Sequence, residues 1–154
     1  MNGAPALRTV GAGVRSTLSG ARILPICPDA YADSLTPFGD EAVAVRDAIV
    51  VWGAFEDDGA LIGVGHLRGA VRPSTQAGVM VAPDRRRLGI AKELVQALIH
   101  DAALRGFSSL VRTHAPDDLC PLRLAESLGL LVARRIGRFD AATCIWLPPP
   151  DFSR

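Results

Sequence analysis

Cysteine is scarce in this sequence, and the three cysteines, Cys27, Cys120 and Cys144, form no C-x-x-C pair. An odd number of cysteines without such a pair argues against a disulfide framework or a zinc site and fits a reduced cytoplasm. No apolar run approaches the length needed to span a bilayer, and residues 1–20 lack the basic start and apolar core of a signal peptide. We therefore expect a cytoplasmic protein with no metal and no membrane partner.

Neither sign of charge is in excess, because 17 Lys and Arg face 16 Asp and Glu for a net charge of +1. This balance gives no global electrostatic reason to expect nucleic-acid binding. All basic residues except Lys92 are arginine, which together with much Ala, Gly and Pro is typical of a GC-rich bacterial genome. The length of 154 residues suits a single domain. We place it at residues 21–148, after a flexible arm at 1–20 and before a tail at 149–154.

The pattern of apolar residues predicts strands first and helices later. From Ile90 the spacing of the apolar residues changes from that of a strand to that of a helix. One stripe contains Ile90, Leu94, Leu98 and Ala102, which predicts an amphipathic helix. A second helix is expected at 119–129. Strands are expected at 21–26, 48–55, 60–69, 75–81, 108–113, 130–136 and 142–147. Helices between strands in the middle and hairpins elsewhere predict a mixed α/β sheet.

The stretch VAPDRRRLGIAKELV, residues 81–95, places three arginines directly before the predicted helix. A helix N-terminus already carries partial positive charge and unpaired N–H groups, so arginines there indicate that an anion binds, most simply a phosphate. The G-x-x-x-x-G-K-[ST] motif is missing, which excludes a nucleotide-hydrolysing P-loop. Residues 86–91 instead have the R-x-x-G-x-A form of a pyrophosphate-binding loop. The alternative is an ordinary strand–helix turn with solvated arginines.

The stretch VMVAPDRRRLGIAKELVQALIHDAALRG, residues 79–106, resembles the acyl-CoA-binding core of the GNAT N-acetyltransferase superfamily. The resemblance continues through LAESLGL at residues 124–130 and covers roughly residues 48–147. It implies a GNAT-like α/β fold: a mixed, mostly antiparallel sheet flanked by helices and splayed between Thr75–Val81 and Ser109–Thr113. It also implies an N-acetyltransferase that moves an acetyl group from acetyl-CoA to a primary amine.

The resemblance further implies which residues hold coenzyme A. Main-chain N–H groups from Arg87 to Lys92 hold the pyrophosphate, and Arg85 or Arg87 adds charge at the 3′-phosphate. The backbone of Val81 pairs with the pantetheine arm and polarises the thioester carbonyl, as an oxyanion hole does. Asp118 falls where the family often has an asparagine near the pantetheine. The cofactor-binding set implied in this way is Met80, Val81, Arg86, Arg87, Leu88, Gly89, Ile90, Ala91, Lys92 and Asp118.

The sequence departs from the family at both common proton-transfer positions. Ala125 stands where the family's tyrosine protonates the leaving thiolate, and Tyr31 lies far away in the sequence. Thr75 and Gln76 stand near the position of the usual glutamate base. His66 is the candidate substitute for that base, because an imidazole accepts a proton near neutral pH. The alternative is a histidine held at a sheet surface.

Other polar residues allow more than one interpretation. His114 and Asp118 flank the end of the strand at 108–113, and Asp118 is equally suited to cap the following helix. Cys120 is expected to pack rather than to act as a nucleophile, because direct attack by an amine needs no cysteine. His100 is expected to be solvated.

Two other functions stay open at this point. A GNAT-like module could bind acyl-CoA with weak or no transfer and act as a sensor or partner domain. A purely structural domain would carry the arginines as surface residues. The acceptor is not determined, since a protein lysine, an N-terminus and a small amine all fit, and a homodimer is compatible with the sequence.

Overall fold

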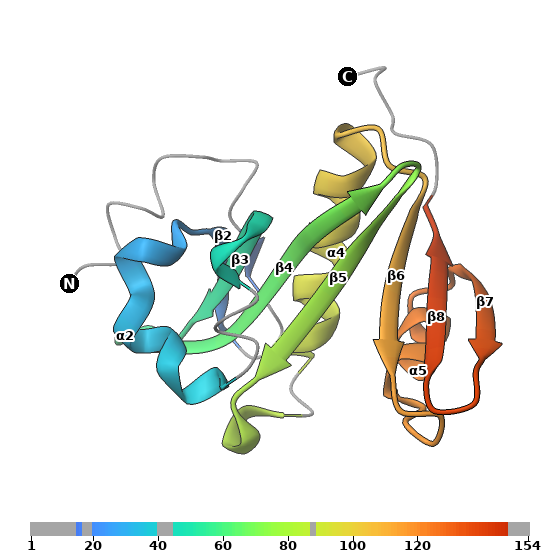
Figure 1. The fold of residues 1–154 in the computed structure, drawn as a ribbon. Coiled ribbons are helices and arrows are strands. Elements are labelled where there is room, and N and C mark those ends of the chain that lie inside the picture. The colour runs from blue at the N-terminus through green and yellow to red at the C-terminus, as the bar shows by residue number, and fades with distance from the viewer. Residues whose placement is uncertain (1–14, 17–19, 40–44, 87–88, 148–154) are drawn as a thin grey trace. The chain divides into compact units, whose positions relative to one another are not determined.

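The computed structural model describes residues 15–16, 20–39, 45–86 and 89–147 (Figure 1). The strands hydrogen-bond in the order β1-β2-β3-β4-β5-β6-β8-β7. Every described pair is antiparallel except β5 with β6. The elements are β1 (Arg15–Ser16), β2 (Arg22–Pro25), η2 (Pro28–Tyr31), α2 (Ala32–Leu35), η3 (Thr36–Phe38), β3 (Ala48–Phe55), β4 (Leu61–Val71), β5 (Ser74–Val81), η4 (Pro83–Arg85), α4 (Ile90–Leu104), β6 (Ser109–His114), α5 (Cys120–Ser127), β7 (Leu131–Ile136) and β8 (Ala141–Trp146).

The chain divides into two compact units, each made from two stretches of sequence. The first unit comprises Met1–Arg68 and Gly78–Leu98, and the second comprises Gly69–Ala77 and Ile99–Arg154. Strands β4 and β5 and helix α4 therefore contribute residues to both units.

In the first unit, β2, β3 and β4 form an antiparallel meander. Leu35 and Phe38, from α2 and η3, pack in one buried cluster with Val51 of β3 and Val64 of β4. The β-branched and apolar run at 48–55 forms a strand because alternate side chains can enter this core. One face of β3 and β4 is thus covered by the segment between β2 and β3.

Helix α4 meets β4 at glycines in the first unit. A Cβ atom on Gly63 would lie 3.2 Å from side-chain atoms of both Ile90 and Leu94, and one on Gly65 would lie 3.3 Å from Leu98. The helix can approach the strand this closely only because neither glycine carries a side chain. The predicted stripe is confirmed, since its four members, Ile90, Leu94, Leu98 and Ala102, are at most 1% exposed.

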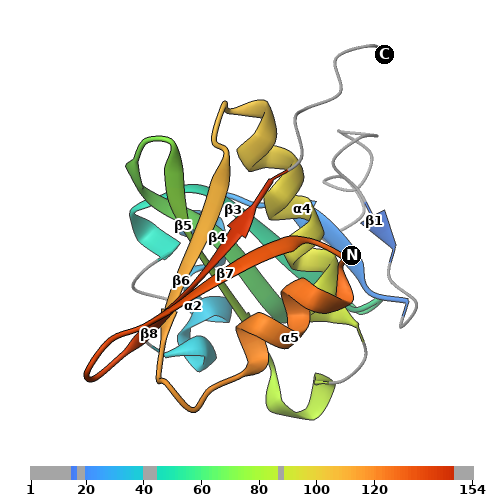
Figure 2. The same cartoon turned by 90° about the vertical axis from the view of Figure 1, so that its right-hand side faces the viewer.

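In the second unit, β8 pairs antiparallel with β6 on one side and with β7 on the other. Helix α5 packs against β7 and β8 (Figure 2). The ladder between β5 and β6 is short, because it joins only Ser74–Gln76 to Ser109–Val111. The remaining residues of β6, Arg112–His114, pair with β8.

The expected fold class is confirmed: the sheet is mixed, mostly antiparallel and flanked by helices. The splay between β5 and β6 stays a prediction. From the predicted arm at 1–20, Arg15 and Ser16 form β1 and pair with β2. Most of that arm and the tail at 149–154 lie outside the described residues. Among the described helices, none has both the length and the apolar character needed to cross a membrane.

The contact between α4 and β4 generates a stability prediction. Leu94→Ala should lower the free energy of unfolding by about 2–5 kcal/mol, because Leu94 is fully buried and its removal leaves a cavity. Leu104→Ala makes the same change in the same helix at a side chain that is 51% exposed, and should cost no more than about 0.5 kcal/mol. Urea unfolding of both variants measures the difference. Equal losses would contradict the described burial of α4.

Candidate functional site

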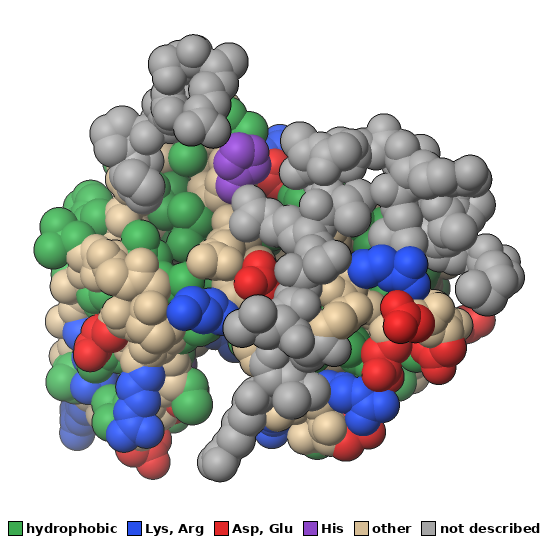
Figure 3. Space-filling view, turned by 180° about the vertical axis from the view of Figure 1, so that it is seen from behind, with side chains coloured by type: hydrophobic (Ala, Val, Ile, Leu, Met, Phe, Trp, Pro, Cys, Tyr) green, Lys and Arg blue, Asp and Glu red, His purple; other side chains and the backbone are tan. Residues whose placement is uncertain are grey.

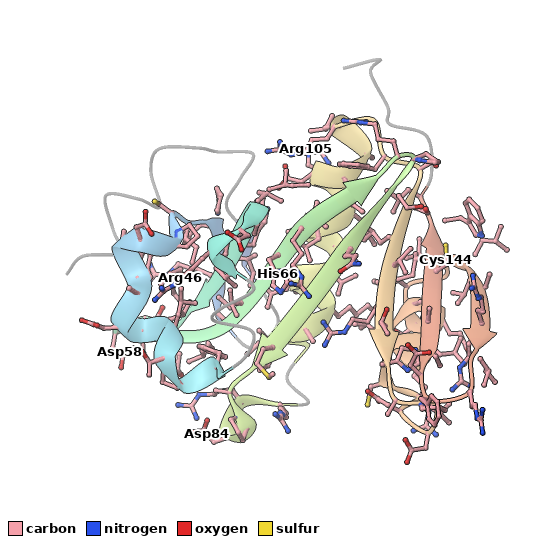
Figure 4. All side chains as sticks on the ribbon, in the orientation of Figure 1. Arg46, Asp58, His66, Asp84, Arg105 and Cys144 are labelled. Atoms are coloured by element: carbon pink, nitrogen blue, oxygen red, sulfur yellow. The ribbon has the colours of Figure 1, made fainter. Side chains whose placement is uncertain are left out.

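The turn between β5 and α4 is held by main-chain hydrogen bonds in the first unit. The N–H of Ala82 donates to the Ile62 carbonyl at 2.8 Å and so ties the end of β5 to β4. The N–H of Arg85 donates to the Ala82 carbonyl at 2.9 Å and closes the short helix η4. Asp84 projects from this turn (Figure 4). The turn is therefore an ordered structure at the point where the arginines begin.

Gly89 gives the turn its last change of direction before α4. Its φ is +82°, a left-handed conformation that side chains other than glycine disfavour, and a Cβ atom there would meet nothing within 4 Å. Its carbonyl accepts the N–H of Glu93 at 3.1 Å and begins the helix. The N–H groups at the start of a helix have no intrahelical acceptor, so α4 offers donors beside an open, bare main chain. This arrangement suits a phosphate.

The other predicted cofactor residues of this stretch differ in exposure. Ile90 is buried, Ala91 is half-buried and Lys92 is exposed. Met80 is partly buried and packs against the core cluster of the first unit. Arg87 and Leu88 lie outside the described residues.

Arg86 is exposed, and its Nε donates to the carbonyl of Val81 at 3.3 Å. This bond links the first arginine of the R-x-x-G-x-A motif to the last residue of β5. Arg86 therefore helps to fold the turn as well as bringing charge to it.

Arg85 is bonded to two carboxylates of the protein itself. Its Nη2 donates to Glu56 Oε1 at 2.8 Å, and its Nη1 donates to Asp84 Oδ2 at 3.0 Å. The hydrogen bond to Glu56 is the main cause that raises the pKa of Arg85 above its ordinary value. Of the two candidates for the 3′-phosphate, Arg85 or Arg87, the structure places the guanidinium of Arg85 on Glu56 and Asp84. Spacing along the chain does not predict the pair of Arg85 and Glu56, because the two residues are 29 positions apart.

His66 lies on β4 opposite Val51 and is 2% exposed (Figure 4). Because side chains alternate along a strand, it shares a face with Val64, while Gly63 and Gly65 face α4. The predicted base is thus a buried residue of the first unit, on the face of β4 opposite α4.

Asp118 belongs to the second unit and precedes α5. Its Oδ1 accepts the N–H of Cys120 at 3.0 Å, and this bond is the main cause that lowers the pKa of Asp118 below its ordinary value. The N-cap position of α5 is Leu119, so Asp118 makes a cap-like bond from one residue earlier. Cys120 is exposed, and the prediction that it packs in the protein is therefore wrong.

His114 is fixed by two hydrogen bonds in the second unit. Its Nδ1 lies 2.8 Å from the carbonyl of Ala115, and its Nε2 lies 2.8 Å from Oγ1 of the fully buried Thr143. A carbonyl can only accept, so Nδ1 carries the proton and Nε2 of the neutral ring accepts from the Thr143 hydroxyl. Both ring nitrogens are engaged within the protein. The sequence did not predict the partner on β8.

Ala125, Tyr31 and Thr75, the residues considered above for the two missing proton-transfer groups, all pack within the described structure. Ala125 is fully buried in α5. The ring of Tyr31 packs against Phe55 in the first unit, with 5.3 Å between ring centroids. Thr75 is buried, and its hydroxyl donates to the carbonyl of Gly69 at 2.9 Å. The structure therefore has a buried alanine and a buried threonine at or near the positions where the resemblance would place a tyrosine and a glutamate.

Charges of both signs are interspersed over the described part of the face seen in Figure 3. No group of three or more His, Cys, Asp or Glu side chains in the described ranges could hold a metal ion.

Comparison with known proteins begins with family profiles. The profile of the acetyltransferase (GNAT) family matches residues 23–129. Among curated proteins, no sequence matches the chain significantly.

Solved structures with a similar fold include three bacterial proteins. The GNAT domain of PAT from S. lividans aligns with a TM-score of 0.72 at 15% identity, over 91% of this chain and all of that one. The IAA acetyltransferase from Bacillus cereus has a TM-score of 0.64 at 20% identity, over 81% and 98% of the two chains. A phosphinothricin acetyltransferase from Sinorhizobium meliloti, in complex with acetyl-CoA, has a TM-score of 0.65 at 18% identity, over 86% and 94%.

The bond between Asp118 and Cys120 generates a pH prediction. The lowered pKa of Asp118 means that its contribution to stability is present above its ordinary value of 3.8 and is lost as the pH falls through the lowered value. Asp118→Ala should lower the free energy of unfolding at pH 7 by about 0.5–1.5 kcal/mol. Asp118→Asn keeps an acceptor without a titrating group, so it should lose less stability than the wild type between pH 5 and pH 2.

The neighbouring exposed carboxylate supplies the control for this experiment. Asp117→Asn removes the same charge without touching the bond to Cys120, and it should leave the acid dependence of the wild type in place. Identical acid profiles for Asp118→Asn and the wild type, measured by urea unfolding, would contradict the assigned cause of the shift.

Proposed function

The chain belongs to the GNAT acetyltransferase family, and on that premise we propose that it transfers an acetyl group from acetyl-CoA to a primary amine. The amine is a protein lysine, an N-terminus or a small amine, and it attacks the thioester directly in a ternary complex. The observation that carries the proposal is Gly89, directly before α4, which has a positive φ and open space where a side chain would stand.

The residues of this turn fit coenzyme A as a ligand. The main chain at residues 87–92 supplies N–H donors for the pyrophosphate, and the helix dipole of α4 adds to the attraction. Arg86 and Lys92, both exposed, bring positive charge. Met80 and Val81 at the end of β5 pair with the pantetheine arm, and Asp118 stands at the sequence position where the family often has an asparagine for that arm. Bound acetyl-CoA supplies an activated acetyl group whose leaving group is a thiolate.

Direct transfer needs few protein groups. The amine nitrogen attacks the thioester carbon, the carbon–sulfur bond breaks, and the proton that the nitrogen loses on forming the amide passes through water to the thiolate. The main-chain N–H of Val81 stabilises the oxygen of the tetrahedral intermediate. Holding the amine and the thioester together supplies much of the rate, which compensates for the alanine at position 125.

An attacking amine must first lose its proton, and His66 is the base of this proposal. An imidazole ring can act as the general base that takes that proton. Its burial sets a strict condition, because the amine has to reach a side chain that is 2% exposed.

A second function in the same family follows from Ala125 and Thr75. Without the tyrosine and the glutamate, the domain would bind acyl-CoA and transfer weakly or not at all, as a sensor or partner module. Binding of coenzyme A is common to both functions, and amine-dependent release of free coenzyme A belongs only to the enzyme.

The function is tested with a panel of amines and peptides. Acetyl-CoA with the right acceptor should release free thiol, while intact-mass measurement without acceptor should find no acetylated protein. Gly89→Glu should weaken coenzyme A binding in calorimetry by more than about 100-fold, because it places a like charge beside the pyrophosphate. Gly20→Glu is the control, since Gly20 also has a positive φ and open space around it. Unchanged affinity in Gly89→Glu would refute the site.

The role of His66 is tested by the pH dependence of turnover. His66→Gln should lower kcat by about 10²- to 10⁴-fold and reduce the dependence of kcat on pH. His100→Gln, an exposed histidine of α4, should change neither kcat nor its pH dependence. A loss below about tenfold in His66→Gln, with the pH dependence of the wild type, would make His66 a structural residue of the sheet.

A further inference from the structure

The two arginines of the turn that the structure describes, Arg85 and Arg86, contact different groups. Arg85 is held by Glu56, a residue of the turn that joins β3 to β4. Both side chains are about one-third exposed, at 34% and 35%, and the bond between them is 2.8 Å long. An exposed ion pair usually contributes little, because two long side chains must be ordered to form it.

In this pair the main chain on each side is already ordered. The N–H of Glu56 donates to the Ala60 carbonyl at 3.0 Å, and the Glu56 carbonyl accepts the N–H of Gly59 at 2.9 Å. On the other side, the N–H of Arg85 is bonded to Ala82, whose own N–H is bonded to Ile62 on β4. The two turns therefore already order the main chain on both sides of the pair, and less conformational entropy is lost when the pair forms. The pair connects the β3–β4 turn to the stretch that leads into α4, within the first unit.

The pair also changes the charge near the start of α4. A free guanidinium is unfavourable beside a helix N-terminus, which carries positive charge of its own. Glu56 and Asp84 balance the charge of Arg85 and hold its donors. Arg85 is then engaged within the protein, and a phosphate at Gly89 would be bound by the main-chain donors and by the arginines that follow Arg85.

We propose that Glu56 is a positioning residue for coenzyme A: by binding Arg85 it fixes the turn before α4 and keeps Arg85 away from the ligand's phosphates. The inference rests on the proposed function. Two roles of the pair have different consequences. If the pair fixes the conformation of the turn, its loss affects every ligand that has a pyrophosphate. If Arg85 instead binds the 3′-phosphate, its loss affects only ligands that carry this phosphate.

Two ligands and three variants separate these roles in calorimetry. Coenzyme A and 3′-dephospho-coenzyme A share the pyrophosphate and differ only in the 3′-phosphate. Glu56→Gln and Arg85→Met should each weaken both ligands by the same factor, about two- to fivefold. The double variant should bind no more weakly than either single one, because both changes remove one interaction.

The control lies next to Glu56 in the same turn. Asp57→Asn removes a carboxylate that is 94% exposed and pairs with Arg22 at 3.5 Å rather than with Arg85. It should leave both affinities unchanged, which separates the loss of the pair from a general change in charge. Circular dichroism of the free variants checks the fold. If Arg85→Met does not fold, Glu56→Gln alone tests the positioning role, since glutamine keeps the shape of the glutamate side chain.

Each other outcome overturns a stated part of the proposal. Unchanged or tighter binding of coenzyme A by Glu56→Gln would remove the positioning role. A loss in Arg85→Met that affects coenzyme A and spares the dephospho ligand would make Arg85 a ligand of the 3′-phosphate. No binding of either ligand by the wild type would overturn the proposed function itself, a result distinct from the first two.

Discussion

The close approach of α4 to β4 is the constraint on which the candidate site depends. Gly63 and Gly65 leave room for Ile90, Leu94 and Leu98 against the strand. Dispersion and burial along this contact hold the first turns of the helix in place. The main-chain donors at the start of α4 are thus oriented by the core of the first unit, and the Arg85–Glu56 pair connects the preceding residues to the β3–β4 turn.

The positive charge before α4 is partly balanced by other groups of the first unit. Three consecutive arginines before a helix would oppose the helix dipole if all were free. Arg85 is balanced by Glu56 and Asp84, and Arg86 gives one of its donors to the Val81 carbonyl. The described part of the turn therefore combines partly balanced charge with main-chain donors at the start of α4, which is the combination that the proposed phosphate site requires.

Much of the fold could be predicted from the sequence because its signals are local. The run at 48–55 and the stripe at Ile90, Leu94 and Leu98 depend on periodicity alone, and both elements have the expected bounds. The motif around Gly89 is also local, because a left-handed residue at a helix start favours glycine.

The parts that could not be predicted depend on contacts between distant residues. The partner of Arg85 lies in another turn, and the partner of His114 lies on β8, so neither follows from spacing along the chain. Alternation indicated that His66 occupies a strand but not that it would be 2% exposed, since depth is set by what packs above the sheet. Cys120 was expected to be buried, but its position at the start of α5 leaves it exposed.

The hydrogen bond between His114 and Thr143 has a consequence for the pairing of β6 and β8. His114 ends β6, and its Nε2 lies 2.8 Å from Oγ1 of Thr143, which pairs with Arg112 in the same ladder. Because successive side chains of a strand point to opposite faces, a slip of β8 by one residue would turn Thr143 away from the imidazole. The bond therefore favours the native register of β6 and β8, in addition to the main-chain hydrogen bonds of the ladder.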